Sequence, residues 1–433
     1  MRQTGSRRAT TAEGTSPAEP LIWWSLQAAL IGVSLIIAEG HDVYRLPKLL
    51  LFEAAAIVLF AGCAIVSILD PQRGILQRLA KHRGPLIIAA AAIGWTAIGT
   101  AASTQKRLSA ETLLWVASCG AFFLLTVALA ERRQVRSVGP ALIAPAIVAG
   151  VAILQRLGIW NPFRFVAAIP IRVRTTGYIG NPDEVGGYLL VPALAAVALA
   201  VANRGTARVA YAAVALLVLV GVMASETLTA LLALSVAAAV MIIILSRRAA
   251  LRMGLAAAAA IALVFILNLS IAERMRNVAS ELLLGRVDMA LSYRTQGFGS
   301  AWAMFVDHPL LGVGPGCFAY WYLPYTMLLS GAHPENLLAL SQKYQDVHND
   351  HLQLLATTGV PGYAIFLVAL LALAARARGE SANARQRFAR LLAAPAAAGV
   401  VVLTLGQFPL ELAALTMMFL YFAALVVAWS DAA

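Results

Sequence analysis

Residues 344–374 read YQDVHNDHLQLLATTGVPGYAIFLVALLALA and place four polar residues, His348, Asn349, Asp350 and His351, directly before a long apolar run. The run is long enough to cross the roughly 30 Å hydrocarbon core of a bilayer as a helix. Comparable apolar runs recur along the whole chain. This stretch therefore predicts a membrane helix that begins with titratable groups, and the recurrence predicts an all-α, polytopic integral membrane protein.

The composition supports a membrane protein. Of the 433 residues, 61% are hydrophobic and 12% are charged, whereas soluble domains carry about 25% charged residues. The pattern predicts twelve transmembrane helices, near residues 21–38, 49–69, 85–102, 112–130, 138–157, 185–202, 210–224, 226–245, 253–270, 349–374, 391–406 and 411–430. The pair around Ser225, Glu226 and Thr227 is either one broken helix or two helices joined by a tight turn.

The net charge of +12 at pH 7 is compatible with nucleic-acid binding, but the positions of the charges favour another interpretation. Most lysines and arginines lie in alternate short connections between the apolar runs, which is the distribution that membrane orientation produces. We therefore expect a cytoplasmic N-terminus and C-terminus and no nucleic-acid partner. The remaining cations gather in the predicted external segments, where they need a separate explanation.

The chain is expected to divide into four parts. Residues 1–20 are polar and predict a disordered cytoplasmic tail. Residues 21–270 carry the first nine helices, and residues 348–433 carry the last three with a short C-terminus. Residues 271–347 are too polar to cross a bilayer and too long for a simple connection, so we expect a large, functional periplasmic loop between the ninth and tenth helices.

A second external segment carries a strong helix-start pattern. In GNPDEVGGYL (180–189), Asn181 can cap a helix whose first residue is Pro182, and two carboxylates follow where the helix dipole favours negative charge. This pattern alone has a purely structural explanation. It does not account for Arg172 and Arg174, two cations that precede it.

The histidines admit three interpretations. On one helix, His348 and His351 would share a face, as metal ligands do, but the sequence fixes no third ligand, so we predict no metal site. They could instead only cap and solvate a helix end. Alternatively His348 is a general base, because histidine is the side chain that titrates near neutrality without perturbation.

The external arginines Arg294, Arg172 and Arg174 suggest an anionic ligand at the membrane face. A guanidinium offers two donors to phosphate oxygens and stays charged when it is partly desolvated. A diphosphate attached to a long lipid fits such a position, with its tail in the bilayer and its headgroup in water. Few ionisable residues lie within the spans, which argues against a transporter with a polar site at the midplane.

Three segments together resemble the O-antigen ligase and O-antigen polymerase superfamily of bacterial glycosyltransferases. They are SYRTQGFGSAWAMFVDHPLLGVGPGCF, VHNDHLQLLATTGVPGY and, upstream, GNPDEVGGYL. The resemblance covers roughly residues 170–370. It implies a multi-pass enzyme of the bacterial inner membrane that takes a glycan from undecaprenyl diphosphate and joins it to an acceptor hydroxyl at the periplasmic face, without metal or other cofactor and with inversion.

The resemblance also assigns roles to particular residues. It places His348 at the reaction centre and Arg294 at the diphosphate, with Asn349 and Asp350 beside the substrate and one of Arg172 and Arg174 as a further phosphate ligand. Relatives often carry a second arginine where this chain has Glu226. Either Arg172 or Arg174 supplies the second cation, or the charges around the donor are arranged differently here.

The acceptor is not fixed by the sequence. O-antigen ligases join O-antigen to lipid A-core in lipopolysaccharide biosynthesis, and this is the reaction that we expect. The alternatives with the same chemistry are an O-antigen or exopolysaccharide polymerase and a protein O-oligosaccharyltransferase. Outside the enzymes, the rival is a transporter or flippase for lipid-linked sugars.

Overall fold

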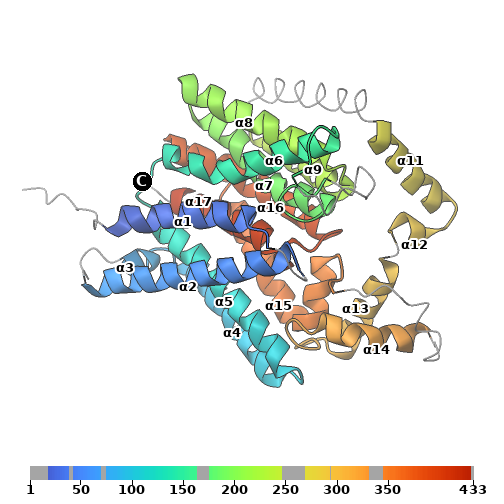
Figure 1. The fold of residues 1–433 in the computed structure, drawn as a ribbon. Helices are drawn as coiled ribbons and strands as arrows, with labels where there is room; N and C mark the ends of the chain where they lie inside the picture. The colour runs from blue at the N-terminus through green and yellow to red at the C-terminus, as the bar shows by residue number, and fades with distance from the viewer. Residues whose placement is uncertain are drawn as a thin grey trace, which may run out of the picture.

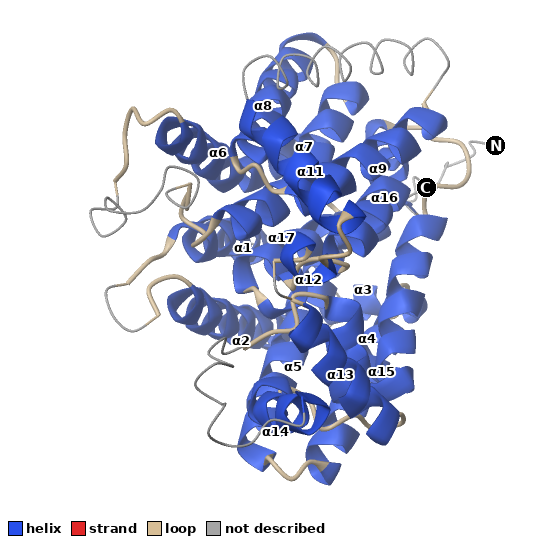
Figure 2. Ribbon diagram, turned by 90° about the vertical axis from the view of Figure 1, so that its right-hand side faces the viewer, coloured by secondary structure: helices blue, strands red, loops and turns tan. Residues whose placement is uncertain are grey.

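The structure is a computed structural model that describes residues 18–38, 42–69, 75–162, 175–245, 269–292, 294–330 and 345–430. These residues form helices and loops with no strand (Figure 2). Nine helices of the described part are long and apolar enough to cross a membrane. The prediction of an all-α, polytopic membrane protein is confirmed.

The spanning helices pack side by side in a bundle, as Figure 1 shows. The first half of the bundle contains α1 (Ala18–Leu35), α2 (Arg45–Leu69), α3 (Ile75–Leu79), α4 (Arg83–Ala102), α5 (Lys106–Ala130), the 3-10 helix η2 (Val135–Leu142) and α6 (Ile143–Arg156). The second half contains α7 (Pro182–Ala202), α8 (Gly205–Ala224), α9 (Leu228–Ile244), α15 (Asp350–Ala375), α16 (Ala384–Thr404), the 3-10 helix η5 (Pro409–Glu411) and α17 (Ala413–Ser430).

Eleven of the twelve predicted spans coincide with helices, although α1 and α9 fall outside the nine long apolar ones. The predicted span at 253–270 lies almost entirely outside the described residues. The uncertain pair resolves into two helices, because α8 ends at Ala224 and α9 begins at Leu228. Glu226 between them has a φ of +53°, a left-handed conformation that reverses the chain in a tight turn.

The core of the bundle lies around α7 and α17. Both helices are apolar on every face, which is the pattern of a helix surrounded by protein. Nearly all of their side chains are buried, including Tyr188, Tyr421 and Trp429. Helices α8, α9 and α16 pack around α7, and α1, α2 and α5 pack around α17. The N-terminus of α7 is therefore held at a fixed place at one end of the bundle.

The segment between α9 and α15 forms further helices at one side of the molecule (Figure 1). These are α11 (Leu269–Leu283), α12 (Val287–Ala290), α13 (Thr295–Asp307) and α14 (Phe318–Ser330). Helices α11 and α13 fall on the two stretches of this segment that have helical patterns, and α14 carries the aromatic sequence FAYWYLPY.

The turn after α13 docks on a kink in α15. Gly312 and Gly359 both have a φ near +67°, and any side chain on either residue would meet the backbone of the other segment. Two backbone bonds join the segments, from Val313 N to the Ala356 oxygen (2.8 Å) and from Val360 N to the Pro309 oxygen (2.9 Å). The glycines of DHPLLGVGPG and LLATTGVPG thus fix α13 against the helix that begins beside His348.

Candidate active site

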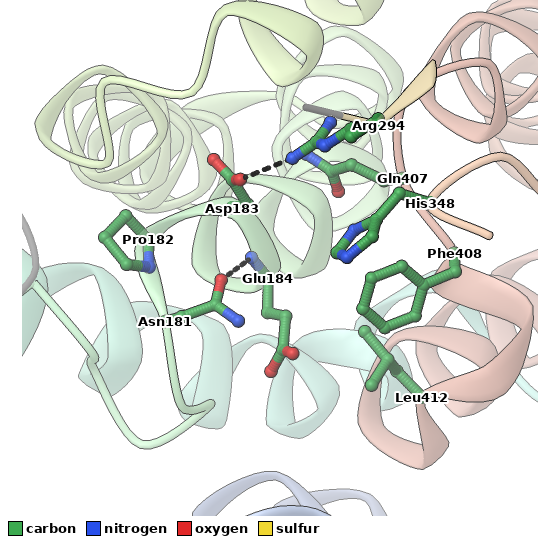
Figure 3. Close-up of a pocket in the computed structure, with 9 residues that line it drawn as sticks. All are labelled: Asn181, Pro182, Asp183, Glu184, Arg294, His348, Gln407, Phe408 and Leu412. Carbon is green, nitrogen blue, oxygen red and sulfur yellow. Dashed lines mark hydrogen bonds and ion pairs between the residues drawn. The ribbon is translucent and has the colours of Figure 1, made fainter. Parts of the chain in front are cut away.

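Four segments far apart in the sequence meet in a polar cavity at the end of the bundle. They are the N-terminus of α7, the residue before α13, the residues before α15 and the connection from α16 to α17. The cavity has a volume of about 140 Å³ and is lined by Asn181, Pro182, Asp183, Glu184, Arg294, His348, Gln407, Phe408 and Leu412 (Figure 3).

The start of α7 is built as its sequence predicts. The Asn181 Oδ1 accepts a hydrogen bond from the Glu184 backbone N–H (2.9 Å), and Pro182 is the first helical residue. The cap directs Asp183 toward Arg294, as Figure 3 shows. The helix terminus thus presents a carboxylate, in a place where its dipole also favours an anionic ligand.

Arg294 joins three of the four segments. It stands immediately before α13, donates from Nη1 to the Gly406 oxygen (2.7 Å) and pairs through Nη2 with the Asp183 carboxylate (3.3 Å). Its side chain is 21% exposed, so the cation is only partly solvated. The residue assigned to the diphosphate by resemblance therefore does line the cavity, where an internal carboxylate contacts it.

His348 lies across the cavity from α7, in an unusual backbone conformation. Its φ of +59° is left-handed, a conformation that persists when the surroundings determine it. The imidazole packs edge-on against the Phe408 ring, with 4.6 Å between centroids. Phe408 also contacts Arg45, whose guanidinium carbon lies 4.8 Å from the ring centroid.

The electrostatic surroundings keep the His348 imidazole neutral at neutral pH. Burial lowers its pKa to about 4, and the charges of Arg294 and Arg45 act in the same direction, while Asp183 opposes them. A neutral imidazole has a nitrogen lone pair that can accept a proton. The site thus combines a cation with a proton acceptor.

Asn349 and Asp350 do not line the cavity. The Asn349 amide caps α15, because its Oδ1 accepts from Leu352 N (3.0 Å), and its Nδ2 donates to the Leu405 oxygen (3.1 Å). The Asp350 side chain is buried and accepts a hydrogen bond from Leu410 N (3.1 Å). Both residues tie the start of α15 to the α16–α17 connection, and their direct contact with substrate stays a prediction.

His351 belongs to the packing of the bundle. Its Nδ1 lies 3.1 Å from the Tyr363 hydroxyl and its Nε2 lies 2.9 Å from the Thr404 hydroxyl. His348 and His351 do not lie on one helix, because α15 begins at Asp350 and His348 precedes it, so the condition for a shared helical face is not met. The described part of the chain gathers no group of three possible metal ligands.

Gln407 was not predicted as a site residue from the sequence. Its side chain is 5% exposed and lines the cavity, and its Nε2 has no hydrogen-bond partner among the described residues. A buried donor without a partner is costly, which indicates a place for a ligand acceptor atom. The only signal in the sequence is a polar residue in a short connection between two apolar spans, and that pattern is too common to single it out.

We expect Gln407→Leu to weaken donor use without weakening the fold. A hydrogen bond of this kind contributes about 0.5–1.5 kcal/mol, so the KM for donor should rise roughly 2- to 10-fold. The melting temperature should stay equal or increase, because an unpaired buried amide is removed. Steady-state rates and thermal unfolding of purified protein measure both effects.

Gln353→Leu is the matched control. This glutamine accepts from Val347 N (2.9 Å) and donates to Glu411 (2.7 Å), so its loss should lower the melting temperature. A Gln407→Leu protein that unfolds earlier while its donor KM is normal would show a structural role only.

Glu226, which stands where relatives often have an arginine, is itself bound by arginines. Its Oε1 accepts from Arg156 Nη2 (2.5 Å), and Arg274 donates to its backbone oxygen. The next residue, Thr227, donates to the Asp183 Oδ1 (3.2 Å). Two cations therefore contact Glu226, next to the residue that binds Asp183, although neither arginine lines the cavity.

Arg172 and Arg174 lie outside the described residues. Their contact with a phosphate group, and the choice between them, stay predictions. Of the predicted site residues within the described part of the chain, Arg294 and His348 share the cavity, and Asn349 and Asp350 support its wall.

The fold and the cavity define a multi-pass membrane protein with a charged site at one end of its helix bundle. A family model described as O-Antigen ligase matches residues 212–367, from within α8 to within α15. This match supports the predicted resemblance to the O-antigen ligase and polymerase superfamily. No curated protein matches the chain.

The matched segment contains Arg294, His348, Asn349 and Asp350. The start of α7, which supplies Asn181 and Asp183 to the cavity, lies upstream of it, as does one of the three segments that carry the resemblance. The family match thus includes Arg294 and His348 of the cavity lining, and the other lining residues lie outside it.

Proposed function

We propose that the protein is an inverting glycosyltransferase that moves a glycan from undecaprenyl diphosphate to an acceptor hydroxyl. The acceptor that we propose is lipid A-core. The single observation that carries this proposal is the meeting of Arg294, Gln407 and a neutral His348 in one cavity at the end of apolar helices. The family match supports ligase-type chemistry on lipid-linked glycans.

His348 and Arg294 each have one role in the proposed reaction. The acceptor hydroxyl gives its proton to His348 while its oxygen attacks the anomeric carbon from the side opposite the diphosphate. The bond from that carbon to the diphosphate oxygen breaks, and its electron pair leaves with undecaprenyl diphosphate. Arg294 stabilises the growing negative charge, and the proton passes from His348 to water. The leaving group is already activated, so the proposed mechanism requires no metal or cofactor.

The size of the cavity is compatible with the reacting centre alone. Ligand sites for whole small molecules usually have volumes of about 300–1,000 Å³, whereas this cavity measures about 140 Å³. A diphosphate and the edge of one sugar ring match that volume. The lipid and the rest of the glycan would then extend along the apolar helices and into solvent.

The distribution of cations supports a periplasmic position for the cavity. At the opposite end of the bundle, Arg78 pairs with Glu19 (2.7 Å), Lys81 pairs with Glu131 (3.1 Å) and Arg385 donates to the Glu131 oxygen (2.9 Å). Short segments rich in arginine and lysine stay in the cytoplasm. That end, where α1 begins and α17 finishes, is therefore assigned to the cytoplasm (Figure 1).

Reconstitution tests the function directly. Purified protein in proteoliposomes receives undecaprenyl-diphosphate-linked glycan with lipid A-core, and we expect a joined product that forms equally well in EDTA. Growth of the lipid-linked glycan without lipid A-core would indicate a polymerase instead, and transfer to an added protein would indicate protein glycosylation. Absence of transfer to every acceptor, with donor intact, would contradict a glycosyltransferase.

A further inference from the structure

A second polar cavity lies beside the catalytic one. It has a volume of about 200 Å³ and is formed by the first turn of α2, the residues before it, η5 and the start of α17. Glu184 and Leu412 line both cavities, so the two share a wall. Figure 3 shows both side chains at the edge of the catalytic cavity.

The second cavity interleaves donors and acceptors. Arg45 and Lys48 of α2 contribute cations, and Glu184, Glu411 and Asp42 contribute carboxylates. Arg45 binds Glu184 Oε1 (3.0 Å) and also Asp346 Oδ2 (2.9 Å), and Gln353 binds Glu411 (2.7 Å). The charged groups are thus fixed in place.

Packing alone does not explain these charges. Lys48 is only 3% exposed, and both cations occupy the first turn of a helix, where the dipole disfavours positive charge. Replacing a buried ion pair by apolar residues often costs no stability. Ionisable residues retained in such a place in a membrane protein indicate a functional site.

Phe408 connects this cavity to the proton acceptor. The centroid of the Phe408 ring lies 4.6 Å from the centroid of the His348 imidazole. The guanidinium carbon of Arg45, which lines the second cavity, lies 4.8 Å from the same Phe408 centroid. Asp346, which Arg45 binds, is two residues before His348. A molecule in the second cavity would therefore lie next to the wall that holds the base.

We infer that the second cavity binds the saccharide end of the acceptor and presents its hydroxyl toward His348. The inference rests on the proposed function and names the acceptor subsite within it. Sugar hydroxyls both donate and accept hydrogen bonds, which suits alternating carboxylates and cations. A second diphosphate would meet Glu411 and Asp42, two carboxylates that line this cavity and not the catalytic one. The rim is open, because Asp42 is exposed and Leu46 is 50% exposed.

Glu411→Gln separates acceptor binding from donor binding. Glu411 lines the second cavity and not the catalytic one, and a glutamine oxygen can still accept the bond from Gln353. Loss of the charged acceptor should raise the KM for lipid A-core about 10-fold or more and leave the donor KM unchanged. Glu131→Gln, at the opposite end of the bundle, is the matched control and should behave as wild type. An unchanged acceptor KM in a folded Glu411→Gln protein would overturn the inference.

Photocrosslinking tests the site without turnover. A benzoylphenylalanine is placed at Leu46 on the rim or at Ile57, an exposed residue further along α2. With rough lipopolysaccharide as the probe, we expect adducts from position 46 that soluble core oligosaccharide suppresses, and none from position 57. Equal labelling at both positions, or labelling that the oligosaccharide does not suppress, would reject the saccharide site. Specific adducts in a protein that transfers no glycan would reject the proposed function and keep the saccharide site.

Discussion

Arg294→Ala should weaken binding of the lipid diphosphate by roughly 30-fold to several thousand-fold. The estimate corresponds to about 2 to 5 kcal/mol for truncating one partner of a charge-assisted contact in a partly desolvated site. The guanidinium reaches the cavity with two donors and is 21% exposed. Equilibrium binding of undecaprenyl diphosphate to purified protein measures the loss, and turnover should fall with it.

Two companion variants separate phosphate binding from folding. Arg294→Lys keeps the charge and loses the two-pronged geometry, so it should restore binding only in part. Arg294→Ala leaves the Asp183 carboxylate without its ion pair (3.3 Å in wild type), which could lower stability by itself. Adding Asp183→Asn removes that carboxylate charge.

The double variant should therefore be stable and still fail to bind donor. Asp183→Asn alone should bind donor at least as well as wild type, because the phosphate no longer competes with a carboxylate for Arg294. Full donor binding by the stable double variant would show that Arg294 has a structural role and does not contact the phosphate.

The fold was predictable to the extent that it depends on local apolar periodicity. Each span is a continuous hydrophobic run, and the start of α7 follows from the capping pattern at Asn181 and Pro182. The sequence could not decide between one broken helix and two helices at Glu226. The two helices are separated by a left-handed turn at Glu226, whose side chain forms an ion pair with Arg156. Such a turn is set by tertiary contact and leaves no periodic signal.

The site was predictable only in part, for a related reason. Arg294 and His348 could be assigned because both lie in the segments that carry the resemblance to the superfamily. Gln407 and Glu411 were missed because their importance comes from the α16–α17 connection, which brings them beside α7 and α15. The helix start was predicted at residue 349, next to the observed start at Asp350, whereas the left-handed backbone of His348 depends on tertiary contacts and could not be predicted.

His348→Asn should reduce glycan transfer by about 10² or more while donor binding is retained, because the base acts on the acceptor hydroxyl in the chemical step. Asparagine tolerates the left-handed conformation at φ +59°, so this variant avoids the backbone strain that alanine would add. His351→Asn is the matched control. It should lower the melting temperature through loss of the Tyr363 and Thr404 contacts, with a much smaller effect on kcat. The reverse order of the two kcat values would make His351 the base.

The pH dependence adds a signature that a structural histidine would not produce. The neutral form of His348 is the active base, and its pKa is lowered to about 4 by burial, with Arg294 acting in the same direction. In the free enzyme, measured as kcat/KM for donor, transfer should therefore persist as the pH falls from 7 to about 5 and fail near 4, whereas an ordinary histidine would lose it near 6.5.

Bound diphosphate adds negative charge beside the His348 ring and raises its pKa, so the acid limb of kcat should lie at higher pH than that of kcat/KM. The measurement is made in wild-type protein at saturating acceptor. Coincident limbs in that protein, or an acid limb that survives in His348→Asn, would contradict proton transfer to His348.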